Sequence, residues 1–399
     1  MNRNTLIGLA IAALVALLAA FWLQRSNAPQ MTSGATPAGW LVPGLRGHVN
    51  DVSRLVITGA GDKTLATLER GADGWGLVEK DGYPVDTGKL RAFLLKLADA
   101  KTVERKTASE DKYPLLGVED VSAPEAKGVR VDLAGLAEPV QLVIGNAAVR
   151  GEGTYVRRVG EEPSWLVSGT LSVARTPAEW LRKDLLDIPA GRIASVTLTP
   201  AEGKPVRIVK ASEDDANFTL EDIPKGREAA SEYTVDGVAS TLGGLQIDDV
   251  MPAGEAVPPE DAIVARYETF DGIVIEVHAW QHEGKDLARF TATLDAARAD
   301  AAIAAAQDKA RAAHEAATKV AGHDEEQADA PAASPAAPLA VSDPAKDRAE
   351  RRSVLDKEVA DLQARLDGWT FVLPSWKYAS MDKALNDLLK PVEGQAPKS

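Results

Sequence analysis

The sequence predicts an α+β protein made of two tandem copies of an antiparallel-sheet-plus-helices unit, preceded by one transmembrane helix. Three observations lead to this prediction: an uncharged apolar run near the start, short alternating strands that recur in the same order, and an Ala-rich insertion in the second copy. Antiparallel hairpins with helices between them are typical of α+β domains and not of doubly wound parallel sheets.

The apolar run Leu6–Leu23 contains no charged residue. Eighteen helical residues at about 1.5 Å each span about 27 Å, close to the thickness of a bilayer's hydrocarbon core. Phe21 and Trp22 lie at its end, where aromatic residues meet a membrane interface. A cleaved signal peptide is the alternative, although Pro29 follows Ala28 and disfavours cleavage there. We therefore predict a cytoplasmic tail over 1–5, an anchor over 6–23 and a Ser/Pro/Gly-rich tether over 24–45.

The first copy is predicted over residues 46–190. Asp86 or Thr87 is expected to cap a helix whose apolar face carries Leu90, Phe93, Leu94 and Leu97. Strands are expected on both sides of this helix, in the segments Arg54–Arg70, Gly74–Glu79, Val129–Gly145, Gly153–Val159 and Ser164–Ser168. A closing helix is expected at Pro177–Leu186, before Pro189.

The second copy is predicted over 191–295 and 367–392, with a tail over 393–399. Tyr233–Asp236 is matched to Tyr83–Asp86, and a shorter helix with Val238, Leu242 and Leu245 is expected to follow it. Its strands are expected at Ser195–Ala211, Asn217–Asp222, Val264–Trp280, Leu287–Leu294 and Gly368–Leu373. Its closing helix is expected at Met381–Lys390.

An insertion over 296–366 replaces the tight turn that Gly160–Pro163 forms in the first copy. We expect an Ala-rich helix over 296–320, a disordered middle over 321–346 and a second helix over 347–366. The second helix carries one apolar stripe, formed by Leu355, Val359, Leu362 and Leu366. The two helices should project as an antiparallel arm whose stripe binds a partner; a partly disordered decoration is the alternative.

The composition argues against several classes of function. A formal net charge of −14 disfavours nucleic acid as a partner, and the lack of cysteine excludes disulfides and thiolate sites. The sequence contains no phosphate-binding loop or nucleophile-elbow motif, so we expect no enzymatic activity, no cofactor and no metal.

Some residues nevertheless keep other functions open. His278 and His282 have the spacing of a helical zinc pair, but they follow a strand pattern that would separate them by about 13 Å. Carboxylates that could serve a hydrolase include Glu276, Glu283 and the run of Glu213, Asp214 and Asp215. Three strand tryptophans are expected in the core, with ligand stacking as the alternative: Trp75, Trp165 and Trp369.

The chain resembles a bacterial family known as domain of unknown function 4340. The resemblance is carried by Gly74–Leu77, Tyr83–Asp86, Tyr113–Gly117, Leu142–Gly145, Gly153–Arg157, Trp180 and Asp184–Leu186. It covers the first copy well and the second loosely. The resemblance implies an envelope protein with one N-terminal anchor, encoded beside ABC-type permeases and components similar to gliding-motility transport proteins, and it implies no catalytic residues.

These observations predict a non-enzymatic accessory protein of an envelope transport complex. The expected location is the bacterial inner membrane, with a cytoplasmic N-terminus, a periplasmic body and inner-membrane proteins as partners. Two other functions remain open. The first is a binding module for a glycan, lipid or peptide in a cleft between the copies. The second is an envelope hydrolase, which needs convergent carboxylates or histidines in a pocket.

Overall fold

The computed structural model describes residues 39–149, 152–324 and 336–391. The predicted anchor Leu6–Leu23, most of the tether and the tail 393–399 lie outside the described residues. Among the helices that are described, none is both long and apolar enough to cross a membrane.

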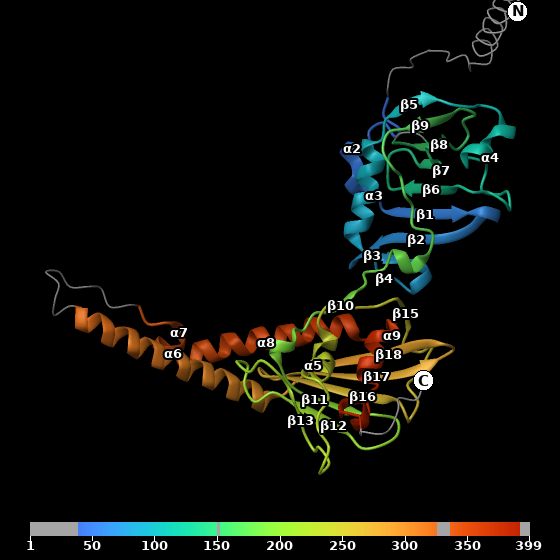
Figure 1. Ribbon diagram of the computed structural model, residues 1–399. Coiled ribbons are helices and arrows are strands. Elements are labelled where there is room, and N and C mark those ends of the chain that lie inside the picture. The colour runs from blue at the N-terminus through green and yellow to red at the C-terminus, as the bar shows by residue number, and fades with distance from the viewer. Residues whose placement is uncertain (1–38, 150–151, 325–335, 392–399) are drawn as a thin grey trace, which may run out of the picture.

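The described chain is α+β, as predicted, and its strands form two large antiparallel sheets (Figure 1). Unit 1 contains a nine-stranded sheet in the order β4-β3-β2-β1-β6-β7-β8-β9-β5. Its strands are β1 (Arg54–Gly59), β2 (Lys63–Gly71), β3 (Gly74–Leu77), β4 (Tyr83–Pro84), β5 (Thr102–Arg105), β6 (Val129–Ala134), β7 (Val140–Ala147), β8 (Thr154–Arg158) and β9 (Ser164–Val167).

Unit 2 contains an eight-stranded sheet in the order β13-β12-β11-β16-β17-β18-β19-β15. Its strands are β11 (Ile193–Thr199), β12 (Val206–Val209), β13 (Thr219–Leu220), β15 (Asp249–Pro252), β16 (Ile263–Thr269), β17 (Ile273–His282), β18 (Lys285–Leu294) and β19 (Trp369–Val372). Two further strands, β10 (Asp184–Leu186) and β14 (Leu245–Gln246), pair with each other beside this sheet. Apart from β4, each strand of the first sheet has a counterpart at the same place in the second. The order β3-β2-β1-β6-β7-β8-β9-β5 of unit 1 corresponds to β13-β12-β11-β16-β17-β18-β19-β15 of unit 2.

One helix of each unit packs on its sheet through the predicted apolar face. In unit 1, α3 (Thr87–Asp99) buries Leu90, Phe93, Leu94 and Leu97, and the Asp86 carboxylate caps it by accepting from the Lys89 amide at 2.9 Å. In unit 2, α5 (Glu232–Ala239) buries Val235 and Val238 and is extended by the short 3-10 turn η7 (Ser240–Leu242).

The segment before α5 corrects the matching of Tyr233–Asp236 with Tyr83–Asp86. Tyr83 lies in β4 and is fully buried, whereas Tyr233 lies inside α5 and is 88% exposed. The cap of α5 is Ser231, whose hydroxyl accepts from the Thr234 amide, so Asp236 is not the counterpart of Asp86. Matching the two similar four-residue segments therefore led to a wrong predicted start for the helix of unit 2, which begins at Glu232.

The predicted tether ends earlier than residue 45. Leu41, Val42 and Leu45 are buried in the core of unit 1, and the Leu41 amide donates to the Ala100 carbonyl at 2.9 Å. The short helix α2 (Leu45–His48) and the 3-10 turn η1 (Val49–Asp51) follow and lead into β1. Residues 40–45 thus belong to the folded unit, because their apolar side chains complete its core.

Both predicted closing helices are wrong over most of their length. Residues 177–179 form only the 3-10 turn η5 (Pro177–Glu179), and Asp184–Leu186 form strand β10. In unit 2, α9 (Ser375–Met381) ends where the helix was expected to begin, and a 3-10 turn, η8 (Leu385–Leu388), follows. The reason is tertiary pairing: the backbone at Leu181 bridges Val85, and that at Leu389 bridges Ala229.

The units meet through a packed aromatic cluster. The Tyr83 ring lies edge-on to Trp369 and Phe371 of β19, with centroid separations of 5.1 and 6.3 Å. Beside it, the Lys80 ammonium lies 2.7 Å from the Asp249 carboxylate. Burial raises the pKa of the Tyr83 phenol. Side chains fill this contact between the units, so it is not the open cleft that a ligand-binding module was expected to have.

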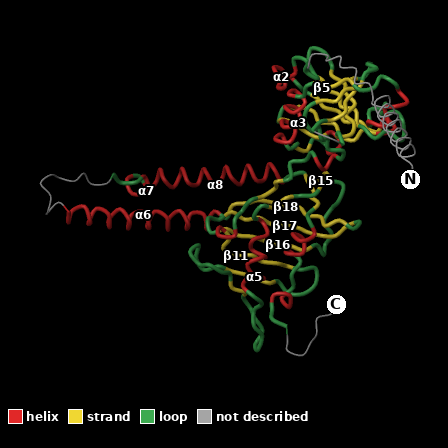
Figure 2. The backbone as a smooth tube through the Cα atoms, turned by 45° about the horizontal axis from the view of Figure 1, so that its top comes forward, coloured by secondary structure: helices red, strands yellow, loops and turns green. Residues whose placement is uncertain are grey.

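The insertion forms an arm of antiparallel helices that leaves unit 2 between β18 and β19 (Figures 1 and 2). It consists of α6 (Ala296–Asp324), α7 (Leu339–Ser342) and α8 (Pro344–Leu366). The two long helices confirm the prediction. The disordered middle expected over 321–346 is too long, since 321–324 and most of 339–346 are helical; residues 325–335 lie outside the described residues.

The base of the arm is fixed to unit 2 by apolar and polar contacts. On α6, Ala299, Ile303 and Gln307 are buried at a spacing of four residues. The Gln307 side chain donates to the Pro344 carbonyl at 2.7 Å and to the Asp347 carboxylate at 2.9 Å, which joins α6 to α8. Gly272, with φ of +95°, lies against the start of α6, where a Cβ would come within 2.8 Å of the Ala299 nitrogen.

Candidate functional site

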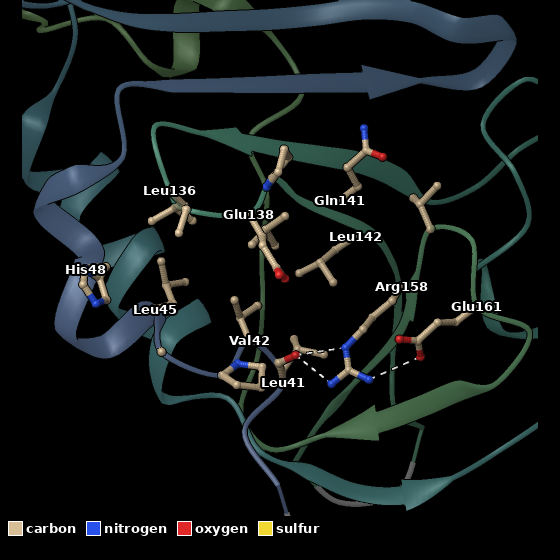
Figure 3. A pocket seen from close by; sticks show the side chains of 16 residues that line it. Leu41, Val42, Leu45, His48, Leu136, Glu138, Gln141, Leu142, Arg158 and Glu161 are labelled. Carbon is tan, nitrogen blue, oxygen red and sulfur yellow. Dashed lines mark hydrogen bonds and ion pairs between the residues drawn. The ribbon is translucent and has the colours of Figure 1, made fainter.

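A pocket of about 610 Å³ opens in unit 1 beside the segment that enters the fold (Figure 3). Three parts of the chain border it: the entering segment 41–48, the β6–β7 turn with the start of β7 at 136–142, and the end of β8 at 158–161. Its size is in the range of ligand and peptide sites in proteins.

Arg158, at the end of β8, organises one wall of the pocket. Its guanidinium donates twice to the Leu41 carbonyl, from Nε at 3.1 Å and from Nη2 at 2.8 Å. Its Nη1 donates to the Glu161 carboxylate at 3.3 Å. The arginine therefore holds the entering segment against the sheet and leaves part of its charge facing the pocket (Figure 3).

The remaining walls combine apolar and acidic groups. Figure 3 shows Leu136, Leu142, Val42 and Leu45 around the pocket, with Glu138 reaching towards its middle. Leu136 and Glu138 belong to the β6–β7 turn: Leu136 is partly buried against the core and Glu138 is exposed, whereas Leu142 is buried. Such a mixed lining suits a surface that presents an apolar group next to a charge.

The pocket wall that is formed by the entering segment 41–48 ends at His48. Its Nδ1 lies 2.6 Å from the Asp51 carboxylate, and the ring lines the rim of the pocket (Figure 3). The sequence analysis missed this site because it assigned residues 41–45 of the pocket wall to the tether. The apolar residues of the segment Trp40–Leu45 are the signal that could have revealed a folded entry.

The stripe predicted to bind a partner is corrected by the structure. Leu355 and Leu366 are 8% and 1% exposed, and Val359 and Leu362 pack against the same core. The four side chains cover the sheet of unit 2 beside β18. The stripe is therefore occupied by this chain's own body and offers no free face to another protein.

The residues considered for metal binding or hydrolysis do not converge on a pocket. Glu276 and His278 lie on the same side of β17, with the His278 Nε2 3.1 Å from a Glu276 oxygen, and Arg266 also contacts Glu276. His282 and Glu283 are exposed at the hairpin turn. Across the described ranges, no group of three or more His, Cys, Asp or Glu residues could hold a metal ion.

The acidic run and the strand tryptophans have structural surroundings. Asp215 accepts from the Ser212 amide at 2.9 Å within an exposed turn, beside Glu213 and Asp214. Trp75 and Trp165 pack against the core while remaining half-buried. Trp369 packs on Tyr83 between the units, so its ring is part of the inter-unit contact.

One buried charge was not foreseen from the sequence. Lys377 of α9 donates from its ammonium to the Thr241 and Gly243 carbonyls at 2.6 and 2.9 Å. Burial lowers its pKa. These carbonyls end the α5–η7 helical segment, so the lysine acts as a C-terminal cap supplied from another element.

Comparison with known proteins gives one match. A family model described as "Domain of unknown function (DUF4340)" matches residues 75–262, from β3 of unit 1 to the start of the β16 hairpin of unit 2. No curated protein and no solved structure matches the chain. The resemblance noted in the sequence is confirmed: across residues 75–262 this chain carries the domain of unknown function DUF4340.

Proposed function

We propose that the two units are tandem copies of one fold and that the chain is a non-enzymatic accessory protein anchored in a bacterial inner membrane. Its periplasmic body would join an envelope transport complex of ABC type and bind inner-membrane subunits. The observation that carries the proposal is the arm, which is built into the core of one unit at its base and projects from the body beyond it (Figure 1).

Equivalent backbone pairings outside the sheets support the duplication. In unit 1 the Thr102 amide, after α3, donates to the carbonyl of Gly39 at 2.8 Å. In unit 2 the Ile247 amide, after α5 and η7, donates to the carbonyl of Lys183 at 3.0 Å. In each unit the segment that enters the fold thus pairs with the segment that follows the helix.

Backbone hydrogen bonds just before α3 and α5 also correspond between the two units. The Asp86 amide donates to the Trp180 carbonyl, and the Ala230 amide donates to the Leu388 carbonyl, both at 2.8 Å. Cation–π contacts recur as well: Arg70 lies over Trp75 in unit 1, and Lys210 over Phe218 in unit 2. Since such pairings do not follow from composition, the shared strand order is better explained by duplication than by chance.

The distal part of the arm supports a binding role. Beyond Gln307, most side chains of α6 up to residue 319 are exposed, although the helix continues to Asp324. A long exposed helix that does not cover its own body gives an accessory protein reach towards neighbouring subunits. Anchoring by Leu6–Leu23 would raise the local concentration of the arm near membrane partners.

Excision of the distal arm tests this proposal. Residues 310–337 are replaced by a short Gly-Ser linker, which keeps the buried base up to Gln307, α7 with its buried Ala340, and the whole of α8. We expect the chain to stay folded and its co-purification with inner-membrane proteins to fall at least tenfold. A matched control, Leu115→Ser on the surface of unit 1, should leave co-purification unchanged.

Two results would contradict the proposal. Undiminished co-purification after excision would show that the arm does not bind the partners. Recovery of the full chain in the cytosolic fraction would show that Leu6–Leu23 does not anchor it in a membrane. A chain that begins at residue 39 should leave the membrane fraction if the anchor has been assigned correctly.

A further inference from the structure

The pocket of unit 1 and the base of the arm on unit 2 occupy equivalent places in the two units. The pocket is bordered by the entering segment, the β6–β7 turn and the end of β8. By strand order, the corresponding parts of unit 2 are the segment from β10 to β11, the β16–β17 turn and the end of β18. The arm leaves from the end of β18, so it stands where unit 1 has its pocket.

In both units an arginine side chain binds a backbone carbonyl at the equivalent position of the entering segment. Leu41 lies two residues after Gly39, and Leu185 lies two residues after Lys183, so the paired entering segments place them at equivalent positions. The Leu41 carbonyl accepts from Arg158 of β8. The Leu185 carbonyl accepts at 3.0 Å from Arg365, which belongs to α8 of the arm. The last turn of α8 therefore lies over the counterpart of the pocket wall.

Apolar and charged contacts hold α8 in this place. Its stripe covers the apolar face of the sheet, and Gln363 accepts from the Ala292 amide of β18 at 2.9 Å. Arg192 forms a bidentate pair with Glu358, at 2.6 and 2.8 Å, and also contacts Asp271. These carboxylates raise the pKa of the Arg192 guanidinium. Unit 2 thus binds an amphipathic helix by an apolar stripe and an adjacent carboxylate.

In unit 1, no counterpart of α8 covers this place among the described residues; the short helix α2 borders it, with Leu45 and His48 in the pocket lining. A tight turn at 160–163 replaces the arm, and the pocket remains between the entering segment and the β6–β7 turn. Ala137 is exposed, Leu136 is partly buried against the core, and the Arg158 side chain is 27% exposed. An apolar surface and a cation are thus both present in unit 1, although the cation comes from β8, where it also donates to Leu41 and Glu161.

We propose that the pocket of unit 1 binds an amphipathic helix of a partner protein. The helix would present an apolar stripe with spacings of four, three and four residues to Leu136 and its neighbours. A carboxylate beside the stripe would meet the guanidinium of Arg158, which comes from β8, whereas the Arg192 that meets Glu358 in unit 2 comes from the 3-10 turn η6 (Ala190–Arg192). This inference rests on the tandem-copy part of the proposed function and names the chemistry of the partner.

A peptide with the sequence of α8, residues 344–366, is the probe. In the full chain the unit 2 surface is already covered by its own α8, so added peptide reports on unit 1. The peptide carries a fluorophore at its N-terminus and a photoreactive residue in place of Leu362, a partly buried residue of the stripe that faces the bound surface. We expect saturable binding by anisotropy and crosslinks within 41–48 and 136–142; a scrambled peptide should not bind.

Matched variants locate the binding. Leu136→Asp is expected to weaken the peptide at least tenfold, because it places a charge on the apolar wall. Ala137→Arg, at a more exposed position, should do the same without disturbing the fold. Leu115→Asp is the control: Leu115 lies on α4 (Tyr113–Leu116), is 76% exposed, and should leave affinity unchanged.

Three results would overturn the inference: no saturable binding, equal affinity in the Ala137→Arg variant, or crosslinks confined to unit 2. Binding of the scrambled peptide with equal affinity would show a non-specific apolar surface and would also overturn it. Because this experiment needs no membrane complex, its failure leaves the arm-excision test of the proposed function intact.

Discussion

Unit 1 and unit 2 follow one strand order but differ in the connection between the last two strands of each large sheet along the chain. Unit 1 uses the turn between β8 and β9, whereas unit 2 inserts the arm between β18 and β19. The insertion leaves the order of the sheet unchanged, because it enters at a hairpin tip where no ladder hydrogen bond is interrupted. The comparison teaches that the arm has two parts, a base that completes the core of unit 2 and a distal part that does not.

The largest expected effect comes from the contact that exists only between the units. Tyr83→Ala removes a fully buried ring packed on Trp369 and Phe371, and should lower the free energy of unfolding by about 3–5 kcal/mol. Unfolding by urea, followed by tryptophan fluorescence, should then separate into two transitions. Tyr233→Ala is the matched control, expected within about 0.5 kcal/mol of the parent. A single transition with little loss in Tyr83→Ala would show that the ring does not couple the units.

The second prediction tests whether the base of the arm is part of the core of unit 2. Leu366→Ala removes a side chain that is 1% exposed at the end of α8, and should cost about 2–5 kcal/mol. Val354→Ala changes an exposed position of the same helix and should cost about 0.5 kcal/mol or less. Thermal unfolding measures both. Equal stability of the two variants would mean that α8 does not belong to the core of unit 2.

The smallest effect concerns the polar contact between α6 and α8. Hydrogen bonding from Gln307, and then from Arg351, holds the pKa of the Asp347 carboxyl below its usual value. The pKa of Asp347 is lower in the folded than in the unfolded chain, so its ionised form stabilises the fold. This stabilisation is fully present above about pH 4, the ordinary pKa of an Asp carboxyl, and is lost as the pH falls through the folded pKa. The protection factors of the α6 and α8 amides, which are corrected for the intrinsic pH dependence of exchange, should therefore fall at acidic pH. Asp347→Asn should flatten this dependence; an unchanged profile in that variant would assign it to other groups.

The sequence predicted best where local pattern and tertiary packing agree. The spacing of Leu90, Phe93, Leu94 and Leu97 placed α3 and its buried face, and the alternating segments placed most strands of both sheets. The Ala-rich run and the spaced leucines likewise placed α6 and α8. In these elements the period of the apolar residues reports directly on the face that becomes buried.

Prediction failed where long-range pairing decided the conformation. The segment Pro177–Leu186 has helical propensity, but its backbone pairs with Val85 and with β14, so most of it is extended. The stripe of α8 was found correctly, yet nothing local shows that its partner is the chain's own sheet. The pocket of unit 1 was missed for the same reason, because Leu41 and Arg158 are distant in sequence and meet only in the fold.

The direct continuity of the arm with two strands has a mechanical consequence. α6 begins two residues after β18, and α8 ends shortly before β19, whose Trp369 touches the Tyr83 ring of unit 1. A load applied at the far end of the arm would act as a torque on these two strands and reach the other unit through the contacts of Tyr83 with Trp369 and Phe371 and through the neighbouring Lys80–Asp249 pair. The helices would transmit the force, and the inter-unit contacts around Tyr83 would receive it.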